Sequence, residues 1–234
     1  MSSEVHTALV IDEVDFFAQA LAPQGARVVE LGCGKAVFAR ALLQRGLART
    51  VTAFEVDRTQ HAANLAAPPV AGLQFVEGGA QAIALPDASA DIVIMLKSLH
   101  HVPLDQLDQA LAEVRRVLVP GGVLYVSEPV YAGDFNDIVK LFHDEGLVRA
   151  AAHAALQRAA AAGVLKGERE VVFDTPLHFR DYDDFVERIV RVTHSDLALP
   201  PALDAEVRRL FAPFQGPDGA RFVRQMRINF LRKP

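Results

Sequence analysis

This sequence is poor in cysteine, in clustered basic residues and in long apolar runs. Its only cysteine, Cys33, cannot form an internal disulfide, which favours a reducing compartment. Lysine and arginine occur singly or in short pairs and the net charge is -5, so we expect no nucleic-acid partner. No apolar run is long enough for a membrane span, and Glu4 and Asp12 interrupt what would otherwise resemble a signal peptide. We therefore expect a soluble, cytoplasmic protein.

What the chain does have is apolar content, at 51% of its 234 residues, which is enough for a full hydrophobic core. Strand-like apolar segments alternate with segments of helical spacing, a pattern typical of helices on both faces of a mostly parallel sheet. We expect a single α/β domain over residues 1–234, because there are no internal repeats and no long linker.

The most informative segment is 28–36, Val-Val-Glu-Leu-Gly-Cys-Gly-Lys-Ala. An apolar run contains Glu30 near its end, two glycines follow at Gly32 and Gly34, and residues 38–43 have helical character. This order predicts a buried strand, a tight turn and a helix N-terminus. Glycines in such a turn let the backbone approach a ligand closely, so we expect a nucleotide-like cofactor there.

Spacing separates three kinds of glycine turn. A P-loop needs glycine at the position of Val29 and a hydroxyl residue at that of Ala36, which excludes it. A dinucleotide-binding turn needs a third glycine where this chain has Val37, which makes that alternative weak. The remaining pattern, acid-x-Gly-x-Gly, resembles the turn of the class I S-adenosylmethionine (SAM) methyltransferases, although the family's usual third glycine is Ala36 here. The resemblance implies that four residues of this segment contact the cofactor: Glu30, Gly32, Cys33 and Gly34.

A second strand, over residues 50–57, ends in carboxylates about twenty residues beyond the glycines. In a doubly wound sheet, an acid at that strand end accepts hydrogen bonds from ribose hydroxyls. The resemblance aligns Glu55 with the family's ribose-binding acid and places Val56 beside the cofactor. Asp57 is the alternative if the register shifts by two residues, but it suits the N-cap of the next helix better.

Residues 75–86 resemble the family segment in which a short strand leads into a turn beside the adenine ring. The family usually has an aspartate where this chain has Gly79. Adenine recognition would therefore fall to the backbone of Gly79 and Ala80, or to the side chain of Gln81.

Residues 87–102 combine an acid, a fully apolar strand and the sequence Leu-His-His-Val. They closely resemble the small-molecule branch of the family, which includes the quinone methyltransferases, and this implies cofactor contacts from Leu96 and Lys97. A helix over 110–118 then ends at Val119-Pro120-Gly121-Gly122, and a strand over 123–129 follows. Four ordered matches across residues 25–130 imply SAM as the cofactor and S-adenosylhomocysteine as the product.

Beyond residue 130 the resemblance fades. Residues 135–162 have helical character, 170–179 and 222–231 read as strands, and acids at 181–184 open a further helix. The family implies a seven-stranded sheet whose last strand is antiparallel, with a helical insertion after the fifth strand that covers the substrate. We place this cap at residues 131–168, with residues 11–21 as its N-terminal partner.

Methyl transfer from a sulfonium is an in-line displacement, which needs a base only if the acceptor must lose a proton. His101 is the candidate base, because it follows the strand expected to meet the substrate and titrates near neutrality. Packing against the following helix explains His101 equally well. Other candidates near the substrate are His100, Glu128, Tyr131 and His178.

The sequence thus predicts transfer of a methyl group to an O, N or C atom of a small molecule, with no metal and no membrane partner, by a monomer or homodimer. Two other functions stay open: a non-catalytic SAM-binding sensor or partner subunit, and an NAD-dependent oxidoreductase with a degenerate glycine motif. Ligand-induced thermal shifts separate NAD from SAM.

Overall fold

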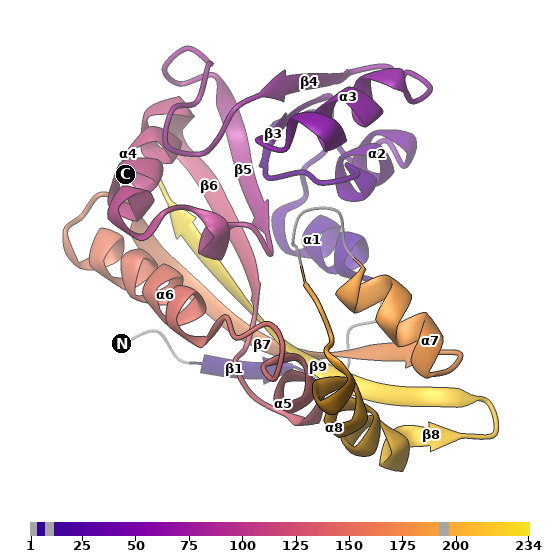
Figure 1. The fold of residues 1–234 in the computed structure, drawn as a ribbon. Helices are drawn as coiled ribbons and strands as arrows, with labels where there is room; N and C mark the ends of the chain where they lie inside the picture. The colour runs from indigo at the N-terminus through magenta and orange to yellow at the C-terminus, as the bar shows by residue number, and fades with distance from the viewer. Residues whose placement is uncertain (1–3, 8–11, 192–196) are drawn as a thin grey trace.

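The computed structural model describes residues 4–7, 12–191 and 197–234, which form one mixed sheet with helices on both faces (Figure 1). Nine strands within these residues build the sheet: β1 Glu4–Thr7, β2 Arg27–Leu31, β3 Thr50–Glu55, β4 Leu73–Glu77, β5 Ala90–Leu96, β6 Leu118–Pro129, β7 Lys166–Phe179, β8 Gln215–Gly216 and β9 Gly219–Arg232. The α-helices are α1 Glu13–Leu21, α2 Val37–Gln44, α3 Arg58–Ala66, α4 Leu107–Val117, α5 Asp134–Val139, α6 Gly146–Ala161, α7 Tyr182–Phe185 and α8 Pro201–Phe211. Short helical segments are η1 Leu99–His101, η2 Leu104–Gln106, η3 Val186–Val190 and η4 Ala212–Phe214.

The strand order is β1-β7-β9-β6-β5-β2-β3-β4, with β8 beside β9. Strands β2 to β6 pair in parallel, and β9 runs antiparallel to both β6 and β7. From β2 the chain winds outward through β3 and β4, and from β5 it winds to the other side through β6. The order therefore reverses between β2 and β5, and doubly wound sheets bind ligands at the carboxyl ends of the strands at such a point.

The seven strands expected from the sequence are β2 to β7 and β9, and the expected antiparallel direction of the last one is confirmed. The sequence missed two short strands. β1 extends the sheet by pairing in parallel with β7, and the two-residue β8 pairs with β9. Strands this short carry too few residues for an apolar alternation to stand out, and their pairing uses backbone groups.

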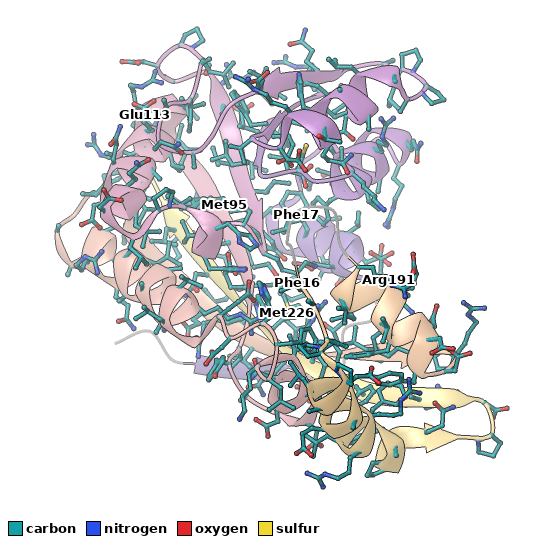
Figure 2. All side chains as sticks on the ribbon, in the orientation of Figure 1. Phe16, Phe17, Met95, Glu113, Arg191 and Met226 are labelled. Atoms are coloured by element: carbon teal, nitrogen blue, oxygen red, sulfur yellow. The ribbon has the colours of Figure 1, made fainter. Side chains whose placement is uncertain are left out.

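One apolar cluster fills each face of the sheet. On the first face, α4 and α6 contribute residues such as Leu111 and Leu156. On the second, α1 presents Phe17, whose ring meets those of Phe38 and Tyr125 edge-on at 5.4 and 5.2 Å between centroids. Figure 2 labels Phe17 at the centre of the molecule. No helix among the described residues is long and apolar enough to cross a membrane.

A third apolar cluster joins α5, α7 and α8 to the carboxyl end of β7 and the start of β9. Its phenylalanine rings, among them Phe179, Phe185 and Phe211, lie 5.3 to 6.5 Å apart between centroids. Figure 1 shows these helices beyond the tips of the β5 and β6 arrows. The third cluster therefore anchors α5, α7 and α8 on the side of the molecule where the parallel strands have their carboxyl ends.

The expected cap over residues 131–168 is helical, but the structure divides it. Helix α6 packs against the sheet beside α4 through Ala152, Ala155 and Leu156, so most of it covers a face of the sheet. Only its N-terminal end reaches η1 at the carboxyl edge, where Glu145 meets His100. Only α5 belongs to the third cluster, and residues 166–168 already lie in β7. Of the expected N-terminal partner, α1 begins at Glu13, while Ile11 lies outside the described residues.

Candidate functional site

The glycine turn joins β2 to α2 at the point where the strand order reverses. Gly32 and Gly34 have φ of +74° and +52°, and Ala36 adopts φ of +53° where the family has a third glycine. A left-handed conformation costs alanine roughly 1 kcal/mol more than glycine. A Cβ on Gly32 would lie 2.6 Å from the Cβ of Ser98, whereas one on Gly34 would meet nothing within 4 Å. Gly32 thus permits a close approach of two loops, and Gly34 faces open space.

Glu55 ends β3 with only 7% of its surface exposed. Its Oε2 accepts a hydrogen bond from the Gly34 amide at 2.7 Å, and its Oε1 accepts one from the Asp57 amide at 2.9 Å. Each carboxylate oxygen has two lone pairs, so both can accept a further bond from a ligand. Asp57 caps α3, as expected, by accepting from the amides of Thr59 and Gln60 at 2.8 and 3.3 Å.

Asn64 of α3 holds the turn from the other side and was missed by the sequence reasoning. Its buried side chain donates from Nδ2 to the Gly34 carbonyl at 2.7 Å and lies 3.7 Å from the sulfur of Cys33. Helix α3 is polar along most of its length, so one asparagine in it gave no signal. Burial raises the pKa of the Cys33 thiol to about 12. The thiol stays protonated, which makes Cys33 a small filler and a poor nucleophile.

Glu30 lies on β2 directly beneath the turn and is 3% exposed. Burial raises the pKa of its carboxyl to about 8, with the nearby charge of Glu55 adding to the rise. Its Oε2 is buried and has no hydrogen-bond partner among the described residues. Such a group either keeps its proton at neutral pH or finds a donor on a ligand.

The turn at residues 78–81 lies against Glu55, because the Gly78 amide donates to the Glu55 carbonyl at 3.1 Å. Ala80 is buried in the first core cluster. The Gln81 side chain folds back over Gly79, where an added Cβ would lie 2.5 Å from its Oε1. A side-chain amide therefore stands close to the position at which the family resemblance expects an aspartate.

Leu96 ends β5, which lies beside β2 at the point where the strand order reverses, and Lys97 follows directly after it. Lys97 has φ of +55°, and its amide donates to the Ser127 carbonyl at 2.7 Å. The Lys97 residue is exposed, yet desolvation lowers the pKa of its ammonium, and the charge of Arg224 acts in the same direction. Val56, 63% exposed, adds an apolar side chain beside Glu55.

His100 of η1 is the centre of a buried network of charged groups. Its Nδ1 contacts Glu128 Oε2, and its Nε2 lies 3.3 Å from Glu145 Oε1. Glu128 also accepts from the Leu99 amide at 2.8 Å, and Arg149 of α6 donates to Glu145 at 2.6 Å. Burial opposes the charge on His100, but its bonds to the two carboxylates outweigh this and raise its pKa to about 9. His100 is therefore a cation at neutral pH.

His101 is exposed, and its ring centroid lies 4.1 Å from that of His100. His100, His101 and Glu145 each offer a nitrogen or oxygen within 4.8 Å of the others. Glu145 and Arg149 carry no signal of this role in the sequence, because both lie in a segment whose pattern indicates only a helix. The expected role of His101 as a base stays a prediction.

The remaining expected substrate residues are only partly brought together. Glu128 joins the His100 network, as described above. The Tyr131 hydroxyl instead donates to Asp144 at 2.9 Å, and His178 Nε2 lies 2.6 Å from the Asp218 carbonyl beyond β8. Both side chains are thus engaged outside the His100 network, and their expected role in substrate binding stays a prediction.

Comparison with known proteins agrees with this geometry. Residues 29–126 match the family described as a methyltransferase domain. The chain is 36% identical over 106 residues to a fatty-acid O-methyltransferase of Mycolicibacterium smegmatis, covering 42% of this chain and 35% of that protein. It is 31% identical over 109 residues to a 2-methyl-6-phytyl-1,4-hydroquinone methyltransferase of Synechocystis, covering 45% and 33%. The chain thus spans about a third of the length of these two relatives.

The fold matches a putative methyltransferase from Bacillus halodurans with a TM-score of 0.65 over 95% of this chain and 99% of that one, at 18% identity. Together, the domain match, the named relatives and the shared fold support a class I SAM-dependent methyltransferase. The recognition made from the sequence, including its likeness to a quinone-type enzyme, is confirmed. The family and the fold imply SAM as the cofactor.

Proposed function

We propose that this protein transfers the methyl group of SAM to a small-molecule acceptor. One observation carries the proposal: the glycine turn is hydrogen-bonded to Glu55, with the Gly34 amide donating to Glu55 Oε2 at 2.7 Å. This contact lies at the point where the strand order reverses. Both residues lie inside the segment that matches the methyltransferase family. Named relatives that act on small molecules support this function over an NAD-dependent oxidoreductase or a non-catalytic sensor.

The residues at this edge fit the cofactor. Gly34 faces open space, so the backbone can lie against the methionine end of SAM. Glu55 keeps lone pairs for the two ribose hydroxyls, and Val56 offers an exposed apolar side chain to the adenosine. The orphaned Oε2 of Glu30 can accept from a donor of the methionine amino group. The side chain of Gln81, folded over Gly79, is the candidate for the adenine amino group.

When bound, SAM supplies an electrophilic methyl group on a positively charged sulfur. The protein's contribution is to hold an acceptor in line with that methyl group, and good alignment can supply about 7 to 11 kcal/mol in the best intramolecular reactions. His100 is not a candidate base, because it is already protonated at neutral pH. Within this proposal the His100 network holds in place the loop after β5, beside which the acceptor binds. His101 is the candidate base for an acceptor that must lose a proton.

Thermal unfolding and calorimetry with SAM, S-adenosylhomocysteine and NAD test the cofactor. At a hundred times its dissociation constant, a ligand of the native state adds about 2.7 kcal/mol to stability. We expect a rise in melting temperature with SAM and S-adenosylhomocysteine and none with NAD. An unchanged melting temperature with both sulfur ligands at millimolar concentration would refute the proposal, and a shift with NAD alone would favour the oxidoreductase.

A further inference from the structure

Two cations at the carboxyl edge are left without a carboxylate partner. Arg224 of β9 makes no ion pair among the described residues, and its Nε is buried with no hydrogen-bond partner there. Lys97 at the end of β5 likewise makes no side-chain hydrogen bond or ion pair within that part of the chain. The two charges are close enough to repel each other. Neighbouring charges of like sign repel each other, and a nearby negative charge lowers this cost, most of all for the partly buried guanidinium of Arg224.

The acids around these cations do not balance them. Glu128 is engaged by His100 and the Leu99 amide, and Glu30 is kept largely protonated by burial, which raises its pKa to about 8. Glu13 of α1, which accepts from the Tyr125 hydroxyl at 3.3 Å, is the remaining acid that acts on both cations.

Arg149 adds a further positive charge near Arg224, but Glu145 neutralises it through a hydrogen bond of 2.6 Å. The balance therefore leaves Lys97 and Arg224 with one carboxylate between them, that of Glu13. A ligand that brings a negative charge to this place therefore meets two cations and lowers their mutual repulsion.

SAM itself brings one carboxylate, but Arg224 lies too far from the expected cofactor site to pair with that carboxylate. The glycine turn that receives the methionine end follows β2, whereas Arg224 lies on β9, three strands away across β5 and β6. Neighbouring strands lie about 4.8 Å apart, so this separation is roughly 14 Å. Lys97 on β5 can serve the cofactor, and Arg224 lies on the acceptor side.

Apolar side chains flank Arg224 along β9. Met226 lies two residues further along β9 and so on the same face of the sheet. Met226 belongs to the apolar cluster against which Phe16 of α1 packs, and Figure 2 shows these two residues near the centre of the molecule. On the other side of Arg224, Phe222 belongs to the third cluster. A guanidinium between two apolar clusters suits a ligand with one anionic end and an apolar body.

We propose that the methyl acceptor is a carboxylic acid with an apolar body, whose carboxylate is bound by Arg224. This inference rests on the proposed function and names the substrate class of the same site. A carboxylate oxygen forms the new O–CH₃ bond with its lone pair, the C–S bond breaks, and its electron pair stays on sulfur. The sulfonium charge and the carboxylate charge cancel, and the products are a methyl ester and the neutral thioether. No proton leaves the acceptor, so no general base is required, in keeping with the protonated state of His100.

The test measures methyl transfer from radiolabelled SAM to butanoate, octanoate, dodecanoate and benzoate, each beside its primary amide and alcohol, with alkyl sulfonates as competitors. Arg224→Met keeps most of the length of the side chain and removes the charge. Arg224→Lys restores a charge but not the planar guanidinium that can donate two hydrogen bonds to one carboxylate. The control is Arg221→Met, an exposed arginine on the opposite face of the same strand. Affinity for S-adenosylhomocysteine is measured in every variant.

We expect methyl esters from at least one acid and no transfer to its amide or alcohol. Arg224→Met should lower kcat/KM about tenfold to hundredfold, the range for one lost charge-assisted hydrogen bond. Arg224→Lys should recover part of this, and Arg221→Met should match the wild type. S-adenosylhomocysteine affinity should stay within about twofold in all three.

The inference is overturned if none of the acids is methylated, if an amide or alcohol is methylated as well as its acid, or if Arg224→Met matches Arg221→Met. Each of these results leaves the proposed function standing as long as S-adenosylhomocysteine still binds. Loss of that binding in the wild type would instead remove the proposed function itself.

Discussion

Glu55→Gln tests the register on which the cofactor site depends. The substitution keeps the shape of the side chain and one acceptor oxygen, but it removes the negative charge. In the present structure both oxygens of Glu55 are used, by the amides of Gly34 at 2.7 Å and Asp57 at 2.9 Å. A glutamine must turn its NH₂ group toward one of these two donors. One buried amide then loses its acceptor.

Two effects follow, and their sizes can be worked out separately. Losing a hydrogen bond to a charged group costs about 1.5 to 3 kcal/mol, so the ligand-free protein should lose stability of this order. The ribose hydroxyls lose charge assistance as well, which should weaken S-adenosylhomocysteine binding by roughly tenfold to hundredfold.

Asp57→Asn is the matched control, since it makes the same chemical change two residues away. Asparagine caps helices about as well as aspartate, so α3 should keep its cap, and binding should change by no more than about twofold. Calorimetric titration with S-adenosylhomocysteine, after melting curves have shown that both variants are folded, compares the two. Greater damage from Asp57→Asn would mean that the ribose assignment is wrong. Wild-type affinity in both variants would mean that no ribose binds at this edge.

Two further predictions concern the glycine turn and the acid beneath it. Gly34→Val should lower S-adenosylhomocysteine affinity at least about tenfold. The control Gly25→Val places valine at another positive φ, at the opposite edge of the sheet, so it should lower stability and leave the affinity unchanged. Equal affinity in both variants would mean that the glycine turn only reverses the chain and does not bind the cofactor. Burial raises the pKa of Glu30 from 4.5 to about 8, so the folded protein holds a proton that the unfolded chain releases between these pH values. The free energy of unfolding therefore falls by about 5 kcal/mol as the pH rises through this window. Glu30→Gln, which stays neutral, should flatten this fall in urea titrations between about pH 5 and pH 9, and an unchanged slope would contradict the assigned protonation.

The local part of the site was accessible from the sequence, because its geometry is set within a few residues. Two glycines separated by one residue, following an apolar run, specify the turn, and the positive φ angles at Gly32 and Gly34 are what such residues permit. The distinction between Glu55 and Asp57 also followed from local chemistry, since aspartate is the better N-cap. The alternation of apolar and helical segments predicted a mostly parallel sheet with helices on both faces, and the family resemblance added seven strands with an antiparallel last one.

The sequence by itself thus determined the strand–turn–helix units, the resemblance to the methyltransferases and the edge of the sheet at which a cofactor is expected, since these depend on short-range spacing. Only the tertiary structure decided which distant side chains meet there. Arg224 reaches the edge because β9 inserts between β6 and β7, and Glu145 reaches His100 because α6 packs beside η1. Such contacts join residues far apart in the chain, and their charges shift one another only once burial has removed water from between them. The same long-range packing turned most of the expected cap into a cover for the face of the sheet.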